Sequence, residues 1–217
     1  NYTVTQINPV TLQKSIDAAN QVIGNYTLES DFGYNFLPGT HENGSEAVFS
    51  IQYSDNDGTL FGRLNYGDVL SLPQGLGCCD FHKPSQNLVN AFKTNAQGLP
   101  MFDTYNDEDL DYKQLNNYKV DPRLYHTVAM PGLPWKYEKD KIYQESWVRS
   151  PGTYGYYASL KENVPVGCGC TVNIDPFYGN SKNRIIIRYS DVLLMKAEAL
   201  IELGRVNEAL PLINQVR

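Results

Sequence analysis

The chain has 217 residues, of which 41% are hydrophobic and 19% are charged, a composition typical of a folded domain with a core. Its formal net charge of −6 and the absence of a basic cluster argue against binding of nucleic acid, whose phosphates repel an acidic surface. The longest apolar runs fall far short of the roughly 20 residues that span a bilayer, and the 16 tyrosines indicate surfaces that are both wet and adhesive.

The first predicted element is a scaffold helix over residues 8–24. Asn8 can cap this helix, and Pro9 suits its first position because that position leaves the backbone N–H without a partner. Gly24 can adopt the left-handed conformation that ends a helix. Between them, apolar residues recur at helical spacing on one side: Leu12, Ile16, Ala19 and Ile23.

The middle of the chain, residues 25–182, holds most of the Gly, Pro, Asn and Tyr residues and shows only short regular patterns. Irregular stretches of this length in a compact domain are usually functional. We therefore expect this loop-rich region to contact a ligand or a partner.

Three short elements are predicted within that region. Alternating apolar residues predict one strand over 47–53, and a second strand is predicted over 125–130, where Pro131-Gly132 stops it. A short helix over 85–93 is predicted with three residues on its inner side: Leu88, Ala91 and Phe92.

The last segment, residues 183–217, predicts a hairpin of two helices. The first ends at Gly204, and Asn207 can cap the second; because the turn is so short, the helices must pack antiparallel. Such a hairpin is the unit of tetratricopeptide-like arrays, and one unit cannot bury its own face. The apolar stripes are Leu193, Ala197, Leu200 and Ile201 in the first helix, and Ala209, Leu210, Ile213 and Val216 in the second.

Four cysteines lie in two tight pairs, Cys78-Cys79 and Cys168-Gly169-Cys170. An even number favours disulfides in an exported protein, and two bonds allow three connectivities, among which cross-links between the two loops would staple the middle region. Zinc is disfavoured because adjacent cysteines bend poorly around one ion. Free buried thiols are the third interpretation, which requires that the protein is not exported.

Aromatic residues in the loops form a candidate binding platform: Trp135, Trp147, Tyr105, Tyr137 and Tyr156. The segment before Trp135 is rich in Pro and Gly, so this rigid loop can present the indole ring outward. Sugar rings stack their C–H faces on aromatic rings, while their hydroxyls need polar neighbours. The alternative is that these aromatic residues pack beneath the loops as small local cores.

Residues for metal binding or catalysis are weakly indicated. Acidic runs at 55–58 and 107–111 offer oxygen ligands for structural calcium, but neither matches an EF-hand loop, so solvated turns are the preferred interpretation and no cofactor is expected. The three histidines stand alone, and no hydrolase motif occurs. A glycosidase pair such as Glu42 and Glu46 would require a carboxyl separation that a sequence cannot supply. Asp121 and Arg123 are interpreted as scaffold, with the guanidinium paired to a neighbouring carboxylate.

Two segments carry a resemblance to a known family. The first runs Ile187-Arg188-Tyr189-Ser190-Asp191-Val192-Leu193-Leu194 and continues with Ala197-Glu198-Ala199, Leu203-Gly204 and Ile213-Asn214-Gln215-Val216-Arg217. The second is Asp121-Pro122-Arg123-Leu124, followed by Pro131-Gly132 and Trp135. With weaker matches at 46–53 and 84–89 in the same order, the chain closely resembles the C-terminal portion of the SusD/RagB family of outer-membrane nutrient-binding lipoproteins.

The resemblance implies a mainly α fold with long irregular loops, in which a SusD-like, tetratricopeptide-type scaffold carries a loop-rich region with short strands. Residues 1–217 would form part of one such domain, and the chain's end inside a predicted helix leads us to expect a longer protein.

The implied role is non-catalytic: a lipoprotein on the outer-membrane surface that captures glycan or peptide nutrients during polysaccharide utilisation and delivers them to a SusC-like TonB-dependent transporter. Its only membrane contact would be an N-terminal lipid anchor, on a cysteine that this chain lacks. The alternative function is an interaction scaffold that docks the transporter without binding nutrient.

Overall fold

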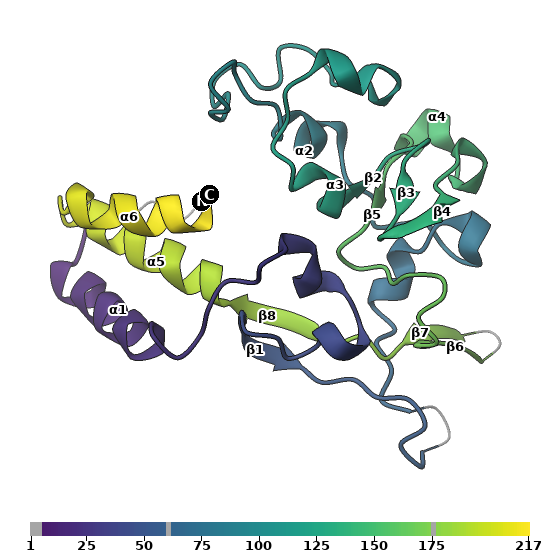
Figure 1. The fold of residues 1–217 in the computed structure, drawn as a ribbon, viewed down its shortest axis with the longest axis horizontal. Helices are drawn as coiled ribbons and strands as arrows, with labels where there is room; N and C mark the ends of the chain where they lie inside the picture. The colour runs from purple at the N-terminus through teal and green to yellow at the C-terminus, as the bar shows by residue number, and fades with distance from the viewer. Residues whose placement is uncertain (1–5, 60–61, 175–176) are drawn as a thin grey trace. The chain divides into compact units, whose positions relative to one another are not determined.

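The computed structural model describes residues 6–59, 62–174 and 177–217 (Figure 1). The chain forms two compact units. Unit 1 holds the chain up to Asn35 together with residues 42–51 and 183–217, and unit 2 holds residues 36–41 and 52–182. None of the helices in the described parts of the chain is both long and apolar enough to cross a bilayer.

Unit 1 combines helices with a two-stranded antiparallel sheet. Helix α5 packs against both α1 and α6, as Figure 1 shows, and small side chains at these contacts let the helices approach closely. The buried residues there are Ile16, Ala197, Ala199, Leu200 and Ala209. The elements are α1 (Pro9–Val22), β1 (Ala47–Ile51), β8 (Arg184–Arg188), α5 (Tyr189–Glu202) and α6 (Val206–Val216).

The ends of α1 and α5 confirm the sequence prediction. The side chain of Asn8 accepts hydrogen bonds from the backbone N–H groups of Val10 and Thr11 at 3.0 and 3.2 Å, which caps α1. Gly24 and Gly204, directly beyond the two helices, have φ values of +101° and +74°, which suit glycine because it lacks a Cβ.

Helix α6 differs from its prediction in two details. Its N-cap position is Arg205, so the prediction that Asn207 caps the helix is wrong. Leu210 is 48% exposed, whereas Leu212 and Ile213 pack beside the buried Ala209. The predicted stripe is therefore confirmed at Ala209 and Ile213 and wrong at Leu210, and of the stripe predicted for α5 only Ile201 is exposed.

The buried carboxylate of Glu46 joins the start of β1 to the start of α5. Its Oε1 accepts a hydrogen bond from the Ser190 hydroxyl at 2.6 Å, and its Oε2 accepts one from the Glu29 N–H and one from the Asn35 amide, each at 3.0 Å. The predicted strand is confirmed as β1, which pairs antiparallel with β8. Its alternating apolar residues Phe49 and Ile51 are exposed, however, so they face away from the core of unit 1.

Unit 2 consists of short elements between long loops. Its strand pairs, all antiparallel, are β2 (Val128–Ala129) with β5 (Ala158–Ser159), β3 (Pro134–Trp135) with β4 (Glu138–Ile142), and β6 (Thr171–Ile174) with β7 (Phe177–Asn180). Its α-helices are α2 (Gln86–Asn90), α3 (Leu124–Thr127) and α4 (Pro151–Tyr154). The 3-10 helices of the chain are Phe32–Phe36, Gly39–His41, Asp68–Ser71, Gln74–Leu76, Tyr112–Asn117 and Glu145–Trp147.

Two predictions for unit 2 are corrected by these elements. Residues 124–127 form helix α3, so only Val128 and Ala129 of the second predicted strand are extended and paired. The predicted helix is present as α2, capped by the Ser85 hydroxyl, but its buried side is formed by Val89 and Asn90. Leu88 and Ala91 are exposed, contrary to the prediction, whereas Phe92 packs against the core as predicted.

The β2–β5 pair separates two small cores in unit 2. Val128 and Tyr157 contribute to one core, and the residues that follow them, Ala129 and Ala158, contribute to the other. This division follows from the alternation of side chains across an extended backbone. Because Tyr157 precedes β5 directly, the position of this strand also decides where the neighbouring aromatic residues lie.

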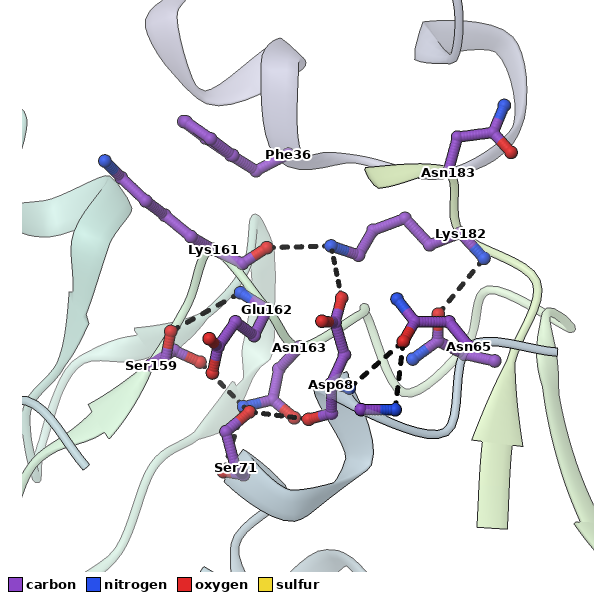
Figure 2. Close-up of polar contacts among 12 residues, drawn as sticks. Phe36, Asn65, Asp68, Ser71, Ser159, Lys161, Glu162, Asn163, Lys182 and Asn183 are labelled. Carbon is purple, nitrogen blue, oxygen red and sulfur yellow. Dashed lines mark hydrogen bonds and ion pairs between the residues drawn. The ribbon is translucent and has the colours of Figure 1, made fainter. Parts of the chain in front are cut away.

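A buried polar network holds the segment that follows β5 (Figure 2). The ammonium group of Lys182 donates to the Lys161 carbonyl at 2.8 Å and lies 3.2 Å from the carboxylate of Asp68. The Asn163 side chain donates to the carbonyls of Ser159 and Ser71 at 2.7 and 3.1 Å. Buried groups bonded in this way resist displacement, so the network anchors residues 159–163 and with them β5.

Candidate functional site

A cavity of about 430 Å³ lies in unit 2 and has walls of tyrosine rings; we call it the tyrosine cavity. Two carboxylates and one amide stand among the rings. The residues that form it include Gln86, Asp109, Asp111, Tyr112, Tyr154, Tyr156 and Tyr157. A second hollow of about 340 Å³ shares Tyr112 and is also lined by Lys113, Pro131, Tyr143 and Glu145. Tyr112 is therefore the wall between two neighbouring hollows.

The carboxylate wall is positioned by the buried side chain of Asn90 on α2. Its Oδ1 accepts a hydrogen bond from the Leu110 N–H at 2.9 Å, and its amide donates to Asn106 and Asp109 at 2.8 and 2.9 Å. The Gln86 amide adds a bond to the Leu110 carbonyl at 3.0 Å. The short helix α2 thus holds residues 106–110 of the acidic loop in place.

Asp111 also has a structural role, because its side chain caps the 3-10 helix Tyr112–Asn117. Its Oδ1 accepts a bond from the Lys113 N–H at 2.9 Å, and its Oδ2 accepts one from the Gln114 side chain at 3.2 Å. This capping begins the 3-10 helix at Tyr112 and so places that ring at the edge of the acidic loop.

The opposite wall comes from α4 and the residues before β5. Tyr157 is buried and donates through its hydroxyl to the Gln86 side chain at 3.1 Å. Tyr156 is partly buried, and its ring centroid lies 5.4 Å from that of Tyr112 at an interplanar angle of 46°. Tyr154, at the end of α4, is more exposed. The tyrosines of this one cavity therefore range from buried, at Tyr157, to 57% exposed, at Tyr154.

Tyr112 is held in place by ionic neighbours. Its hydroxyl donates to Glu145 Oε1 at 2.7 Å, and burial together with this carboxylate raises the pKa of Tyr112 to about 12. The bonds from Tyr112 and Lys113 lower the pKa of Glu145. Lys113 lies 3.2 Å from the same oxygen and 5.4 Å from the centroid of the Tyr112 ring. The phenol therefore stays protonated and the carboxylate charged at neutral pH.

Trp135 does not face solvent, contrary to the prediction of an outward ring, and Trp147 is partly buried. Trp135 is 0% exposed, and its indole N–H donates to the Val164 carbonyl at 3.0 Å. Trp147 packs edge-on against Trp135 and Tyr143, with ring centroids 6.4 and 5.7 Å away. Trp135 belongs to a local core beneath the loops, which is the alternative interpretation of the sequence, and the partly buried Trp147 packs against that core.

Of the five predicted platform residues, Tyr156 is the one found among the described residues that line the tyrosine cavity. Tyr137 is 47% exposed elsewhere in unit 2, where its hydroxyl lies 3.2 Å from Nδ1 of His126. Tyr105 is partly buried and lies in the loop between α2 and the 3-10 helix Tyr112–Asn117. The sequence did not single out Tyr112 or Asn90. For Tyr112 the signal was a tyrosine directly after a capping aspartate, and for Asn90 it was a polar residue within the short helix α2.

The cysteines bond within their pairs. Cys78 is joined to Cys79 and Cys168 to Cys170, so neither bond connects the two loops, contrary to the expectation of cross-links between them.

The acidic run at 55–58 bonds to its own neighbours, whereas the run at 107–111 is not a simple solvated turn, because Leu110 is buried and Asp109 and Asp111 line the tyrosine cavity. The hydroxyl and N–H of Thr59, with the Ser54 hydroxyl, lower the pKa of Asp57 to about 2. Within the described ranges, no three His, Cys, Asp or Glu side chains converge on a position that could hold a metal ion. Arg123 pairs with Asp121, its Nε donating to Oδ1 at 2.9 Å, as the scaffold interpretation predicted.

Comparison with known proteins gives one consistent result. The sequence pattern of the SusD family matches residues 45–217. A SusD-like protein from Formosa agariphila is 42% identical over 72 residues, which is 30% of this chain and 14% of that relative.

Solved structures agree at the level of the fold. A SusD-like protein from Bacteroides fragilis matches with a TM-score of 0.62 at 19% identity, covering 94% of this chain and 42% of that one. A SusD-like carbohydrate binding protein from the same species has a TM-score of 0.67 at 20% identity, covering 95% and 40%. A laminarin binding SusD-like protein has a TM-score of 0.52 at 19% identity, covering 95% and 44%. The chain thus spans less than half the length of these solved relatives.

Proposed function

Because this chain belongs to the SusD family, we propose that it is part of a non-catalytic protein that binds oligosaccharides, with the tyrosine cavity as the binding site. The observation that carries this proposal is the pair of rings Tyr112 and Tyr156, 5.4 Å apart, beside the carboxylates of Asp109 and Asp111. Rings of this kind stack on the C–H faces of a pyranose, and the carboxylates accept hydrogen bonds from its hydroxyls.

The wider role follows the family. We propose that the complete protein is a surface-exposed lipoprotein of the outer membrane that passes its ligand to a SusC-like TonB-dependent transporter. Helices α1, α5 and α6 would belong to a tetratricopeptide-type scaffold, for which the packing of α5 against both neighbours is the support. A transporter gene beside this one, and co-purification of the two proteins, would test this part.

Titration calorimetry with neutral oligosaccharides tests the cavity directly. Tyr112→Ala and Tyr156→Ala should each weaken binding about tenfold, because each removes a stacking surface worth about 1.4 kcal/mol. Tyr125→Ala is the matched control, since Tyr125 is an exposed tyrosine that is not among the residues forming the cavity. Unchanged affinity in both cavity variants would reject this site.

The second candidate function is a scaffold that docks the transporter and binds no nutrient. The exposed rings Phe81 and Phe102 and the exposed Tyr154 of unit 2 favour it, because such side chains also suit a protein interface. A glycan array separates the two functions: no signal on a broad array, with retained transporter binding, would favour the scaffold.

A further inference from the structure

The charge of the tyrosine cavity restricts what it can bind. Its polar wall carries Asp109 and Asp111, and none of the described residues that line it is a lysine, arginine or histidine. At neutral pH the cavity therefore presents two negative charges beside its rings. This inference rests on the proposed function, since it specifies the ligand of the same site.

Neighbouring charges strengthen this negative potential. The loop that forms this wall also carries Asp103, Asp107 and Glu108, and residues 94–112 contain no basic side chain. Lys93 is buried beneath the loop, where its ammonium group donates to the carbonyl of Glu108. Lys119 also donates to the loop, at the Ala96 carbonyl 3.2 Å away, so two ammonium groups stand against five acidic charges and the loop stays negative.

The ammonium group of Lys113, which lies beside the rings, is already paired with a carboxylate. Lys113 lies close to the rings of Tyr112 and Tyr156, at 5.4 and 5.9 Å from their centroids. Its ammonium group, however, is 3.2 Å from the carboxylate of Glu145, and it lines the second hollow rather than the tyrosine cavity. Lys113 and Glu145 together add no net charge.

The hydrogen-bonding groups point the same way as the charge. Asp109 Oδ1 accepts one bond from Asn90 and Asp111 accepts bonds from Lys113 and Gln114, which leaves further lone pairs on both carboxylates for a ligand. A carboxylate is an acceptor only, so it needs a donor such as a sugar hydroxyl. A uronate or sulfate ester offers acceptors and a negative charge instead.

We infer that the tyrosine cavity selects uncharged glycans, whose hydroxyls donate to Asp109 and Asp111, and rejects glycans that carry uronate or sulfate groups. The rings supply the stacking surface for either kind of sugar. The carboxylates decide between them, because like charges repel and acceptors cannot bond to acceptors.

The test compares two panels on the full chain by affinity electrophoresis and calorimetry. The neutral panel is laminarin, xylan, galactan and mannan, and the anionic panel is polygalacturonate, alginate and carrageenan. We expect the best neutral glycan to bind at least tenfold more tightly than any anionic one at low salt, with a smaller gap in 0.5 M NaCl because salt screens the repulsion.

A charge-removing double variant makes the test specific. Asp109→Asn with Asp111→Asn keeps an acceptor for Asn90 and a good helix cap, so the fold is retained. The double variant should reduce the ratio of neutral to anionic glycan affinity about tenfold. Asp140→Asn is the control, because Asp140 is an exposed acid on β4 away from the residues that form the cavity.

Each outcome is decisive. An anionic glycan that binds as tightly as the best neutral one, with binding lost in Tyr112→Ala, overturns the selection by charge and leaves the proposed site intact. Binding that is equally selective in wild type and in the Asp109→Asn, Asp111→Asn variant also overturns it. Binding to neither panel rejects the proposed function and this inference with it.

Discussion

The hydroxyl of Tyr112 donates a 2.7 Å hydrogen bond to Oε1 of Glu145, and this bond joins two segments that are 33 residues apart at the wall between two hollows. The bond orients the Tyr112 ring, for which we propose a stacking role, while Lys113 balances the charge of Glu145. Tyr112 therefore connects the electrostatics of the site with its stacking surface.

The phenol of Tyr112 should titrate late. Burial and Glu145 raise its pKa to about 12, so its protonated form is retained through pH 11, at which an ordinary tyrosine is mostly ionised. Since this pKa lies above the unfolded value near 10, its contribution to stability is present below pH 10 and is lost as the pH rises through 12.

Carbon NMR of the tyrosine Cζ atoms measures this pKa, with Tyr112→Phe to assign the signal. Glu145→Gln should lower the pKa of Tyr112 toward 10 because it removes the negative charge. An unchanged pKa in Glu145→Gln would show that burial alone is responsible.

Trp135 should act as a core residue. Its side chain is fully buried and its N–H bonds to Val164, so Trp135→Ala should lower the free energy of unfolding by about 3–5 kcal/mol. Urea denaturation followed by circular dichroism measures the loss. Trp147→Ala is the comparison, and because Trp147 is only partly buried it should cost less. Equal, small effects in both variants would contradict the burial of Trp135.

Asn90 should control the acidic loop. Asn90→Ala leaves the buried Leu110 N–H without its acceptor, which costs about 1–3 kcal/mol, and releases Asn106 and Asp109. Hydrogen exchange should show the Leu110 amide exchanging faster, and glycan affinity should fall with it. Asn87→Ala, an exposed asparagine on the same helix, should leave both measurements unchanged.

Glu46 should make unit 1 sensitive to acid. Burial acts to raise its pKa, but the bonds from Ser190, Glu29 and Asn35, with the charge of Arg188, outweigh burial and lower it below 4.5. The contribution of Glu46 to stability is therefore present above pH 4.5 and is lost as the pH falls through the lowered pKa.

The measurement is the free energy of unfolding between pH 7 and pH 3. Glu46→Gln should reduce stability at pH 7 and flatten the dependence on pH in the acid range. Glu198→Gln on α5 serves as the control, because Glu198 takes no part in this set of bonds. The same slope in wild type and Glu46→Gln would contradict the role of this carboxylate.

Three helix boundaries were predictable because they depend on local chemistry, whereas the start predicted for α6 at Asn207 was wrong. An asparagine before a proline can accept hydrogen bonds from the first N–H groups of its own helix, and a glycine after an apolar stripe can adopt the left-handed conformation that ends one. Neither depends on distant residues, so the boundaries predicted at Asn8, Gly24 and Gly204 are correct. The buried faces of α1 and α5 were largely predictable, but single positions of the other helices were not: Val89 and Leu212 are packed where Leu88 and Leu210 were expected. Neighbouring positions on an apolar helix differ by a rotation, and only the partner element selects between them.

The sequence by itself determined the family, the ends of α1 and the end of α5, and the acidic, tyrosine-rich composition. Only the tertiary structure decided which aromatic residues line the tyrosine cavity, because Tyr112 and Tyr156 are 44 positions apart in the chain yet their ring centroids are 5.4 Å apart in space. Trp135 shows the reverse case, since its exposure depends on loops that close over it from distant segments such as Val164. Stacking sites are made by contacts between remote residues, and those contacts are set by packing rather than by the order of residues along the chain.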